Sequence, residues 1–85
     1  MEVGKKYYII EHAYYHVIGE VIAVLGPRTV RLKNCIQIHS CPRSWTEFFR
    51  DGAKSDTRFD HLSSEHTTQD AIRYDIWEHP IPRKS

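Results

Sequence analysis

Apolar residues in the first half of the chain form aromatic and β-branched runs, and from residue 29 they alternate with polar residues, a pattern that predicts β-strands. The predicted strands cover residues 7–10, 16–25, 29–33 and 35–39. Gly19 interrupts the second strand and indicates a bulge or sharp bend there. Gly26-Pro27 is a strong turn signal, and Asn34 marks a break between the last two strands.

The pattern changes to helical spacing after the predicted strands. Ser44 and Glu47 match a capping box, in which each side chain satisfies a free backbone amide at the start of a helix. Gly52 is a natural stop. Three aromatic residues share one face of this segment, namely Trp45, Phe48 and Phe49. We therefore predict one short helix near residues 44–51, docked through its aromatic face.

The last third combines a polar stretch with a second alternating segment. Residues 54–69 are rich in Ser, Thr, His and Asp and predict a long polar loop, with Phe59 and Leu62 as anchors. Residues 71–77 alternate and predict the closing strand, with Ile72, Tyr74 and Ile76 against Arg73, Asp75 and Trp77. The fold class predicted for residues 1–85 is a single mainly β (α+β) domain, a small barrel of about five strands with one short helix.

Several segments resemble known proteins. The run Gly4-Lys5-Lys6-Tyr7-Tyr8-Ile9 followed by Tyr15-His16-x-x-Gly19 is similar to the first hairpin of SH3-like or Sm-like small barrels. The helix segment 45–52 and the ending Trp77-Glu78-His79-Pro80-Ile81-Pro82 resemble a family of short tailed-phage proteins. The family implies no established chemistry. Phage chains of this size resemble in kind the anti-defence proteins that sequester nucleotide immune signals, such as cyclic oligonucleotides.

Charge and composition narrow the classes of partner. Among 85 residues, twelve Lys and Arg face eleven Asp and Glu, which gives a net charge of +1. A basic nucleic-acid binder carries a large positive excess, so nucleic acid is possible but not favoured. No apolar run approaches the roughly 20 residues of a membrane span. We expect a cytoplasmic protein, in the infected bacterial host, whose Cys35 and Cys41 are free thiols.

Aromatic residues and cations interleave along the chain, as a nucleotide site requires. Bases need π-faces, and phosphates need guanidinium or ammonium groups. The predicted ligand-binding residues are Tyr14, Tyr15, His16, Arg28, Arg31, Lys33, Arg43, Trp77 and His79. Adjacent strand residues face opposite ways, so one of Tyr7 and Tyr8 should be exposed. The alternative is that half of the aromatic residues fill the core and the arginines line solvated edges.

Metal and catalytic chemistry are weaker interpretations. Cys35-x-x-x-His39-x-Cys41 places three possible ligands on one side of an extended chain, with His61 or His66 as a fourth. Incidental polar residues at a strand end explain it better, and we predict no metal and no cofactor. Nothing resembles a catalytic triad or a Gly-rich phosphate loop, so we predict no catalytic residues and no enzyme activity.

The function expected from the sequence is non-enzymatic sequestration of a nucleotide second messenger, to counter host antiviral defence. The alternative is a small barrel that binds nucleic acid or protein in phage replication or host takeover. A barrel of this length fills its interior with side chains, so an enclosed site would need several copies. We therefore expect a homo-oligomer. The contact is expected near exposed residues among Tyr14, Tyr15, Arg28, Arg31 and Trp77.

Overall fold

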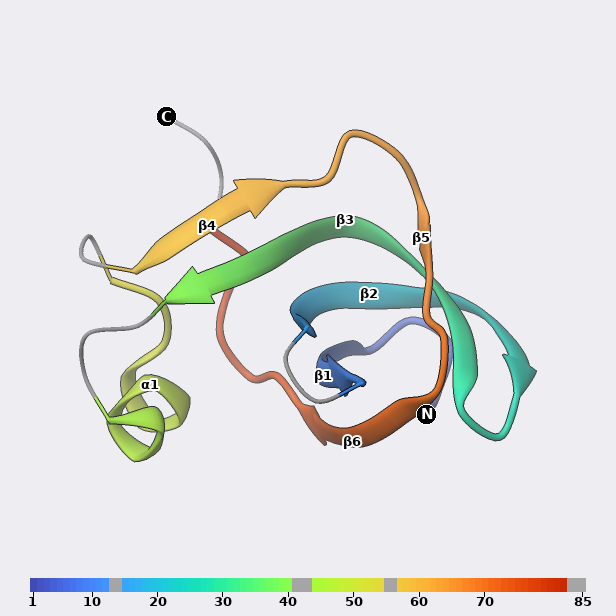
Figure 1. Cartoon of the computed structure of the whole chain (residues 1–85), viewed down its shortest axis with the longest axis horizontal. Coiled ribbons are helices and arrows are strands. Elements are labelled where there is room, and N and C mark those ends of the chain that lie inside the picture. The colour runs from blue at the N-terminus through green and yellow to red at the C-terminus, as the bar shows by residue number, and fades with distance from the viewer. Residues whose placement is uncertain (13–14, 41–43, 55–56, 83–85) are drawn as a thin grey trace.

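A curled antiparallel sheet with one helix against its outer face forms the protein, in a computed structural model that describes residues 1–12, 15–40, 44–54 and 57–82 (Figure 1). The strands are β1 (Lys6–Glu11), β2 (Tyr15–Gly26), β3 (Thr29–Ser40), β4 (Arg58–His61), β5 (His66–Thr67) and β6 (Ala71–Ile76), and the helix is α1 (Trp45–Asp51). The prediction of a mainly β domain with one short helix is confirmed, with six strands rather than about five. Within the described residues, no helix is long and apolar enough to cross a membrane.

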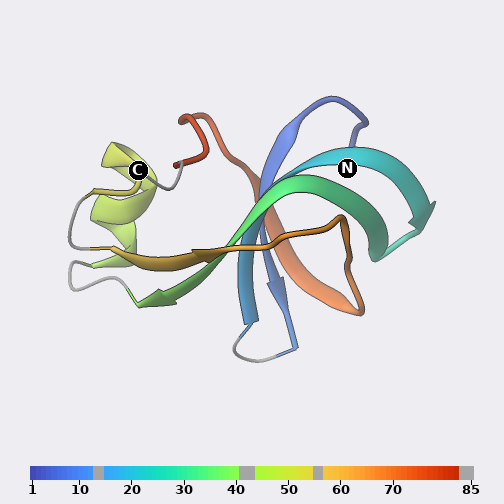
Figure 2. The same ribbon diagram turned by 90° about the horizontal axis from the view of Figure 1, so that it is seen from above.

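The strand order explains how the sheet curls. Neighbours follow β4-β3-β2-β1-β6, and β5 pairs with β3 beside β4. Residues 68–70 then carry the chain from the edge of β3 round to β6 beside β1 (Figure 1). Thr68 N donates to Val30 O at 2.9 Å, and Ala71 N donates to Arg28 O at 3.2 Å. Figure 2 shows α1 at one end of the molecule and the turn between β2 and β3 at the other.

A bulge in β3 replaces the break that Asn34 predicted. The strand is continuous through Asn34, which has a positive φ of 52°. Pairing with β2 shifts by one residue here, because Ile18 faces Ile36 while Glu20 faces Lys33. The extra residue reverses which side of the sheet each later side chain faces. β3 therefore contributes buried side chains to both faces of the sheet.

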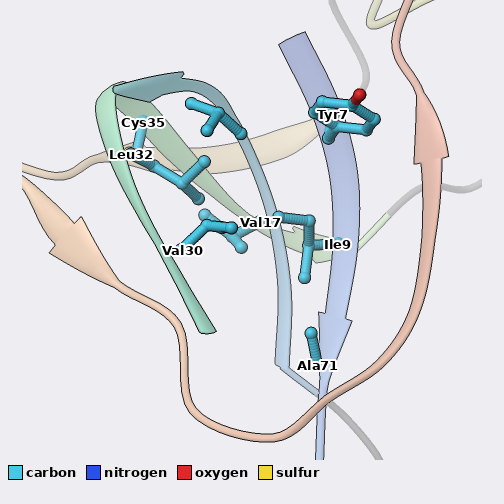
Figure 3. Packing of buried hydrophobic residues seen from close by; sticks show 8 residues of the cluster. Tyr7, Ile9, Val17, Val30, Leu32, Cys35 and Ala71 are labelled. Carbon is cyan, nitrogen blue, oxygen red and sulfur yellow. The ribbon is translucent and has the colours of Figure 1, made fainter. Parts of the chain in front are cut away.

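Two apolar clusters cover the two faces. The inner cluster lies within the curl and contains Tyr7, Ile9, Val17, Val21, Val30, Leu32, Cys35 and Ala71, which are drawn as sticks in Figure 3. The outer cluster lies under α1 and contains Tyr8, Ile18, Ile36, Ile38, Phe48 and Trp77. Because both faces are covered, Tyr7 and Tyr8 are only 4% and 2% exposed. The prediction that one of this pair is exposed is wrong.

The helix begins and ends where the sequence predicted. Ser44 Oγ accepts from Glu47 N at 3.2 Å, the N-cap bond of the predicted box. Gly52 has a φ of 80° and donates its N–H to Phe48 O at 2.9 Å. Phe48 is fully buried, whereas Trp45 at the start of the helix is 42% exposed.

The segment after the helix differs from the prediction. Residues 54–69 contain β4 and β5, so the prediction of a long loop is wrong. Both short strands pair along β3, and most of their polar side chains are exposed, whereas His66 on β5 is partly buried. The predicted closing strand is confirmed as β6, but its apolar face lies at the surface. Ile72, Tyr74 and Ile76 are 53%, 46% and 55% exposed, whereas Trp77 after the strand is buried.

Candidate functional site

An aromatic pocket of about 410 Å³ opens on the outer face of the sheet, beside α1. Its walls come from four elements that are far apart in the sequence. They are β1 with Tyr8 and Ile10, β2 with His16, α1 with Trp45 and Phe49, and β6 with Arg73. We call this the aromatic pocket. Antiparallel pairing of β1 with β2 and β6 sets Ile10 between His16 and Arg73, and the helix supplies the remaining wall.

Two rings form the flat wall of the aromatic pocket. The His16 imidazole and the Trp45 indole stack with centroids 5.0 Å apart and planes only 7° from parallel. The Tyr8 hydroxyl shares a hydrogen bond with His16 Nδ1, which fixes the orientation of the imidazole. Burial lowers the pKa of His16 below its usual value near 6.5. The imidazole is therefore mostly neutral at pH 7, so the wall is aromatic rather than cationic.

The packing behind this wall makes it rigid. The Tyr8 ring contacts Phe49 with centroids 4.9 Å apart, and it lies against Phe48 and Trp77. Trp77 is 2% exposed, and its indole N–H finds no hydrogen-bond acceptor among the described residues. These rings hold Tyr8, and through it His16, in one position. A binding surface held in this way loses little conformational freedom when a ligand arrives.

Arg73 supplies positive charge at the rim of the aromatic pocket. Its side chain is 68% exposed, and Nε lies 3.5 Å from Asp75 Oδ2. That distance and exposure make the ion pair weak. The guanidinium can therefore turn part of its donor fork toward an anion in the pocket.

The structure separates the predicted ligand-binding residues. Of these, His16 lies in the aromatic pocket, and Trp77 lies beneath it in the outer cluster. His79 hydrogen bonds through Nε2 to Phe49 O at 2.9 Å, and its carbonyl accepts from Lys6 Nζ at 2.5 Å. Trp77 and His79 thus fasten the end of the described chain to the helix and to β1. Trp77 is too buried for the predicted subunit contact.

The remaining predicted residues lie elsewhere. Arg28 pairs with Asp70 at 3.1 Å, Lys33 with Glu20 at 3.5 Å, and Arg31 is exposed on β3. Tyr14 and Arg43 fall outside the described residues. These three cations do not line the aromatic pocket, so the described members of the expected set do not form one site.

A second, smaller cleft of about 220 Å³ surrounds Tyr15. Its ring stacks on His66 with centroids 5.7 Å apart. His66 Nε2 lies 2.7 Å from Glu11 Oε2, and Glu11 Oε1 accepts from Gln69 N at 2.6 Å. Glu11 is buried, and its two oxygens bond the His66 side chain on β5 and the backbone of Gln69 in the segment that leads to β6. The residues that line this cleft therefore connect β1 to the segment that closes the sheet.

The possible metal ligands do not gather. Cys35 is buried in the inner cluster, and burial raises the pKa of its thiol to about 11. His39 is exposed and bonds Asp60 at 2.6 Å, while Cys41 lies outside the described residues. Across the described ranges, no three His, Cys, Asp or Glu side chains are placed to hold a metal ion.

Sequence reasoning missed most of the aromatic pocket. Tyr8 and Trp45 were recognisable as aromatic residues, but no local signal places α1 against β1. Arg73 was recognisable only as the polar face of the closing strand. No family model, curated protein or solved structure matches this chain. Function is therefore inferred from the pocket.

Proposed function

We propose that this protein is a non-enzymatic binding protein whose aromatic pocket takes a nucleotide. The observation that carries the proposal is the parallel His16–Trp45 ring pair in a pocket of about 410 Å³ with Arg73 at its rim. Small-molecule sites are usually concave, largely apolar and edged by a few polar groups. This pocket has those properties within one chain. It lies outside the filled interior of the sheet, so it needs no second copy to form.

The chemistry of the walls favours a planar, anionic ligand. A base can stack on the Trp45 indole, which is 42% exposed and is oriented by its stacking against His16. A phosphate on the same ligand can reach the guanidinium of Arg73, which is open to solvent. The pocket volume of about 410 Å³ falls within the range of about 300–1,000 Å³ that is typical of ligand sites.

The resemblance to short phage proteins suggests how such binding would be used. The protein would act in the cytoplasm of the infected host and hold a nucleotide second messenger, such as a cyclic oligonucleotide. Bound messenger is lost to the host effector by mass action, and no bond is broken. Proteins that bind single-stranded nucleic acid also use stacking rings beside an arginine. The experiment below therefore distinguishes a nucleotide from a nucleic acid as the ligand.

Calorimetric titration tests the proposal, with adenosine monophosphate and a cyclic dinucleotide of adenosine as probes and adenosine as the comparison without phosphate. Loss of stacking in Trp45→Ala should weaken binding by roughly 5- to 150-fold, while Trp45→Phe keeps a π-face and loses less. Arg73→Gln should weaken the binding of phosphorylated probes more than that of adenosine. Arg58→Gln is the matched control, because Arg58 is also exposed on an edge strand but lies outside the pocket.

The outcomes separate the alternatives. Binding of one probe per pocket that is lost in Trp45→Ala and kept in Arg58→Gln supports the proposal. Absence of binding at millimolar probe, or binding indifferent to Trp45→Ala, overturns it. Affinity for an oligonucleotide that greatly exceeds affinity for both probes and falls steeply with salt would favour the nucleic-acid alternative, because counterion release scales with the phosphates contacted.

A further inference from the structure

In the part of the chain that the structure describes, the outer edge of β6 has no partner strand, and its apolar side chains are only partly covered. β6 is the last strand in the sheet order, and its one partner among the described strands is β1. Among the described residues, nothing else forms a backbone hydrogen bond with residues 72–76. Ile72, Tyr74 and Ile76 are each about half exposed. An edge strand with exposed apolar side chains is a template for pairing with another strand.

Backbone hydrogen-bonding groups alternate in direction along β6, and this alternation shows which residues can bond a strand on the side away from β1. Trp77 N donates to Lys6 O at 3.0 Å, so this residue turns its hydrogen-bonding groups toward β1. Alternation along an antiparallel ladder turns Asp75 and Arg73 the same way. It leaves the N–H and C=O of Tyr74 and Ile76 directed away from β1. Ile72 lies at the bulge opposite Ile10 and Glu11.

We infer that β6 pairs antiparallel with β6 of a second copy, about a two-fold axis at Tyr74. In this register the outward-facing backbone of Tyr74 meets that of Tyr74 in the second copy. Each Ile72 then lies opposite an Ile76. Each Arg73 lies opposite an Asp75, on the other side of the joined sheet. The six-residue strand is thus self-complementary in both hydrophobicity and charge.

The charges of Arg73 and Asp75 favour the register centred on Tyr74 over the registers centred on either adjacent residue. A shift that centres the axis on Arg73 places two arginines opposite each other, and one centred on Asp75 places two aspartates opposite each other. Only the register centred on Tyr74 pairs unlike charges twice. A second copy supplies this complement by symmetry, which favours it over an unrelated strand as the occupant.

The other edge strand is a strict comparison. β4 carries Arg58-Phe59-Asp60, the same spacing of an arginine and an aspartate around an aromatic residue. There, however, Asp60 bonds His39 at 2.6 Å and Phe59 packs against the outer cluster. In β6 the central Tyr74 stays 46% exposed although the edge of its ring contacts Tyr7, and among the described residues the ion pair of Asp75 is the weak contact with Arg73. The geometry therefore points to β6 and not to β4.

Light scattering after size exclusion tests the inference, with charge reversals that predict both loss and rescue. The wild type should show twice the single-chain mass of 10.0 kDa at high micromolar concentration. Arg73→Asp and Asp75→Arg should each give single chains, because like charges then oppose each other twice. An equimolar mixture of the two variants should recover the doubled mass, since every cross-strand pair is again of unlike charge. This rescue also shows that both variants fold.

Arg58→Asp is the control, with the same change in net charge on the other edge strand. It should keep the doubled mass. A wild type that stays a single chain, a dimer that persists in Arg73→Asp, a mixture that fails to associate, or a dimer lost in Arg58→Asp would each overturn the inference. None of these measurements uses a ligand. The pairing can therefore fail while the proposed nucleotide binding stands, and the reverse also holds.

Discussion

Gly19 on β2 lies directly against Cys35 on β3, beside the bulge at Asn34. A Cβ atom at position 19 would lie 2.8 Å from Cys35 Sγ and 3.0 Å from Leu32 Cβ. Both distances are shorter than ordinary van der Waals contacts, and all three residues are buried. The bulge and the glycine thus depend on each other, because only a residue without a side chain permits this approach.

Gly19→Ala should therefore destabilise the fold by about 1–3 kcal/mol, the usual cost of overpacking a core. Urea denaturation measures the change. Gly26→Ala is the control, since its nearest neighbour is 3.9 Å from the added Cβ. Adding Cys35→Ala to Gly19→Ala should recover part of the loss by removing the closest atom. Equal stability of the two glycine variants would show that the strands can separate freely.

Ser44→Ala should reduce the free energy of unfolding by about 1 kcal/mol, because it removes the acceptor for Glu47 N at the start of α1. Ser44→Thr keeps an acceptor and should lose clearly less. Both are measured by denaturant titration. If Ser44→Ala matched the wild type, water would be replacing the cap without cost.

Stability should fall as the solution is acidified through the pKa of His16. Burial lowers this pKa in the folded state, so the unfolded chain takes up a proton at higher pH than the folded protein does. Stability is therefore fully present above about pH 6.5 and is lost as pH falls toward the lowered value. The slope of unfolding free energy between neutral and mildly acidic pH should be smaller in His16→Gln than in the wild type. An unchanged slope would contradict this assignment.

Glu11→Ala should be strongly destabilising. The buried carboxylate accepts from Gln69 N and pairs with His66, and hydrogen bonds to a charged group contribute about 1.5–3 kcal/mol each. Glu20→Ala is the comparison, because it breaks only the partly exposed pair with Lys33 and should cost less than about 1 kcal/mol. Thermal unfolding of the two variants side by side gives the measurement. A similar loss of stability in both variants would show that Glu11 does not hold the closing segment of the sheet in place.

Any nucleotide bound by this protein should be returned intact. The one described thiol, Cys35, is buried and protonated at neutral pH, so it is a poor nucleophile. Long incubation with a cyclic dinucleotide, then heat denaturation and chromatography, should recover the starting compound. A cleaved product that disappears in a Trp45→Ala preparation would identify the protein as an enzyme.

The elements with local signals were predictable from the sequence. Ser44 and Gly52 bracket α1 because capping depends on bonds within a few residues of the helix end. β4 was missed because residues 58–61 contain one apolar side chain, Phe59, which is too few to give a strand pattern, and their conformation comes from pairing with β3. Asn34 was interpreted as a break because the sequence does not distinguish an asparagine with positive φ inside a strand from an asparagine in a turn.

The site was less predictable than the fold. Exposure of Tyr7 or Tyr8 follows from alternation only when one face of a sheet is open, and here α1 closes the second face. His16 was identified, but its partner Trp45 lies on a helix whose docking position depends on contacts distant in sequence. Such contacts decide which of several aromatic residues become a binding wall and which become core.

The position of β1 between β2 and β6 has a consequence for synthesis on the ribosome. β1 is made first, and the neighbour that covers one of its two edges is made more than sixty residues later. The hairpins from β1 to β3 can form early from contacts close in sequence. Until residues 71–76 emerge, however, the strand that carries Tyr7, Tyr8 and Ile9 keeps an open edge. Stalled or shortened nascent chains should therefore be the form of this protein most in need of chaperones.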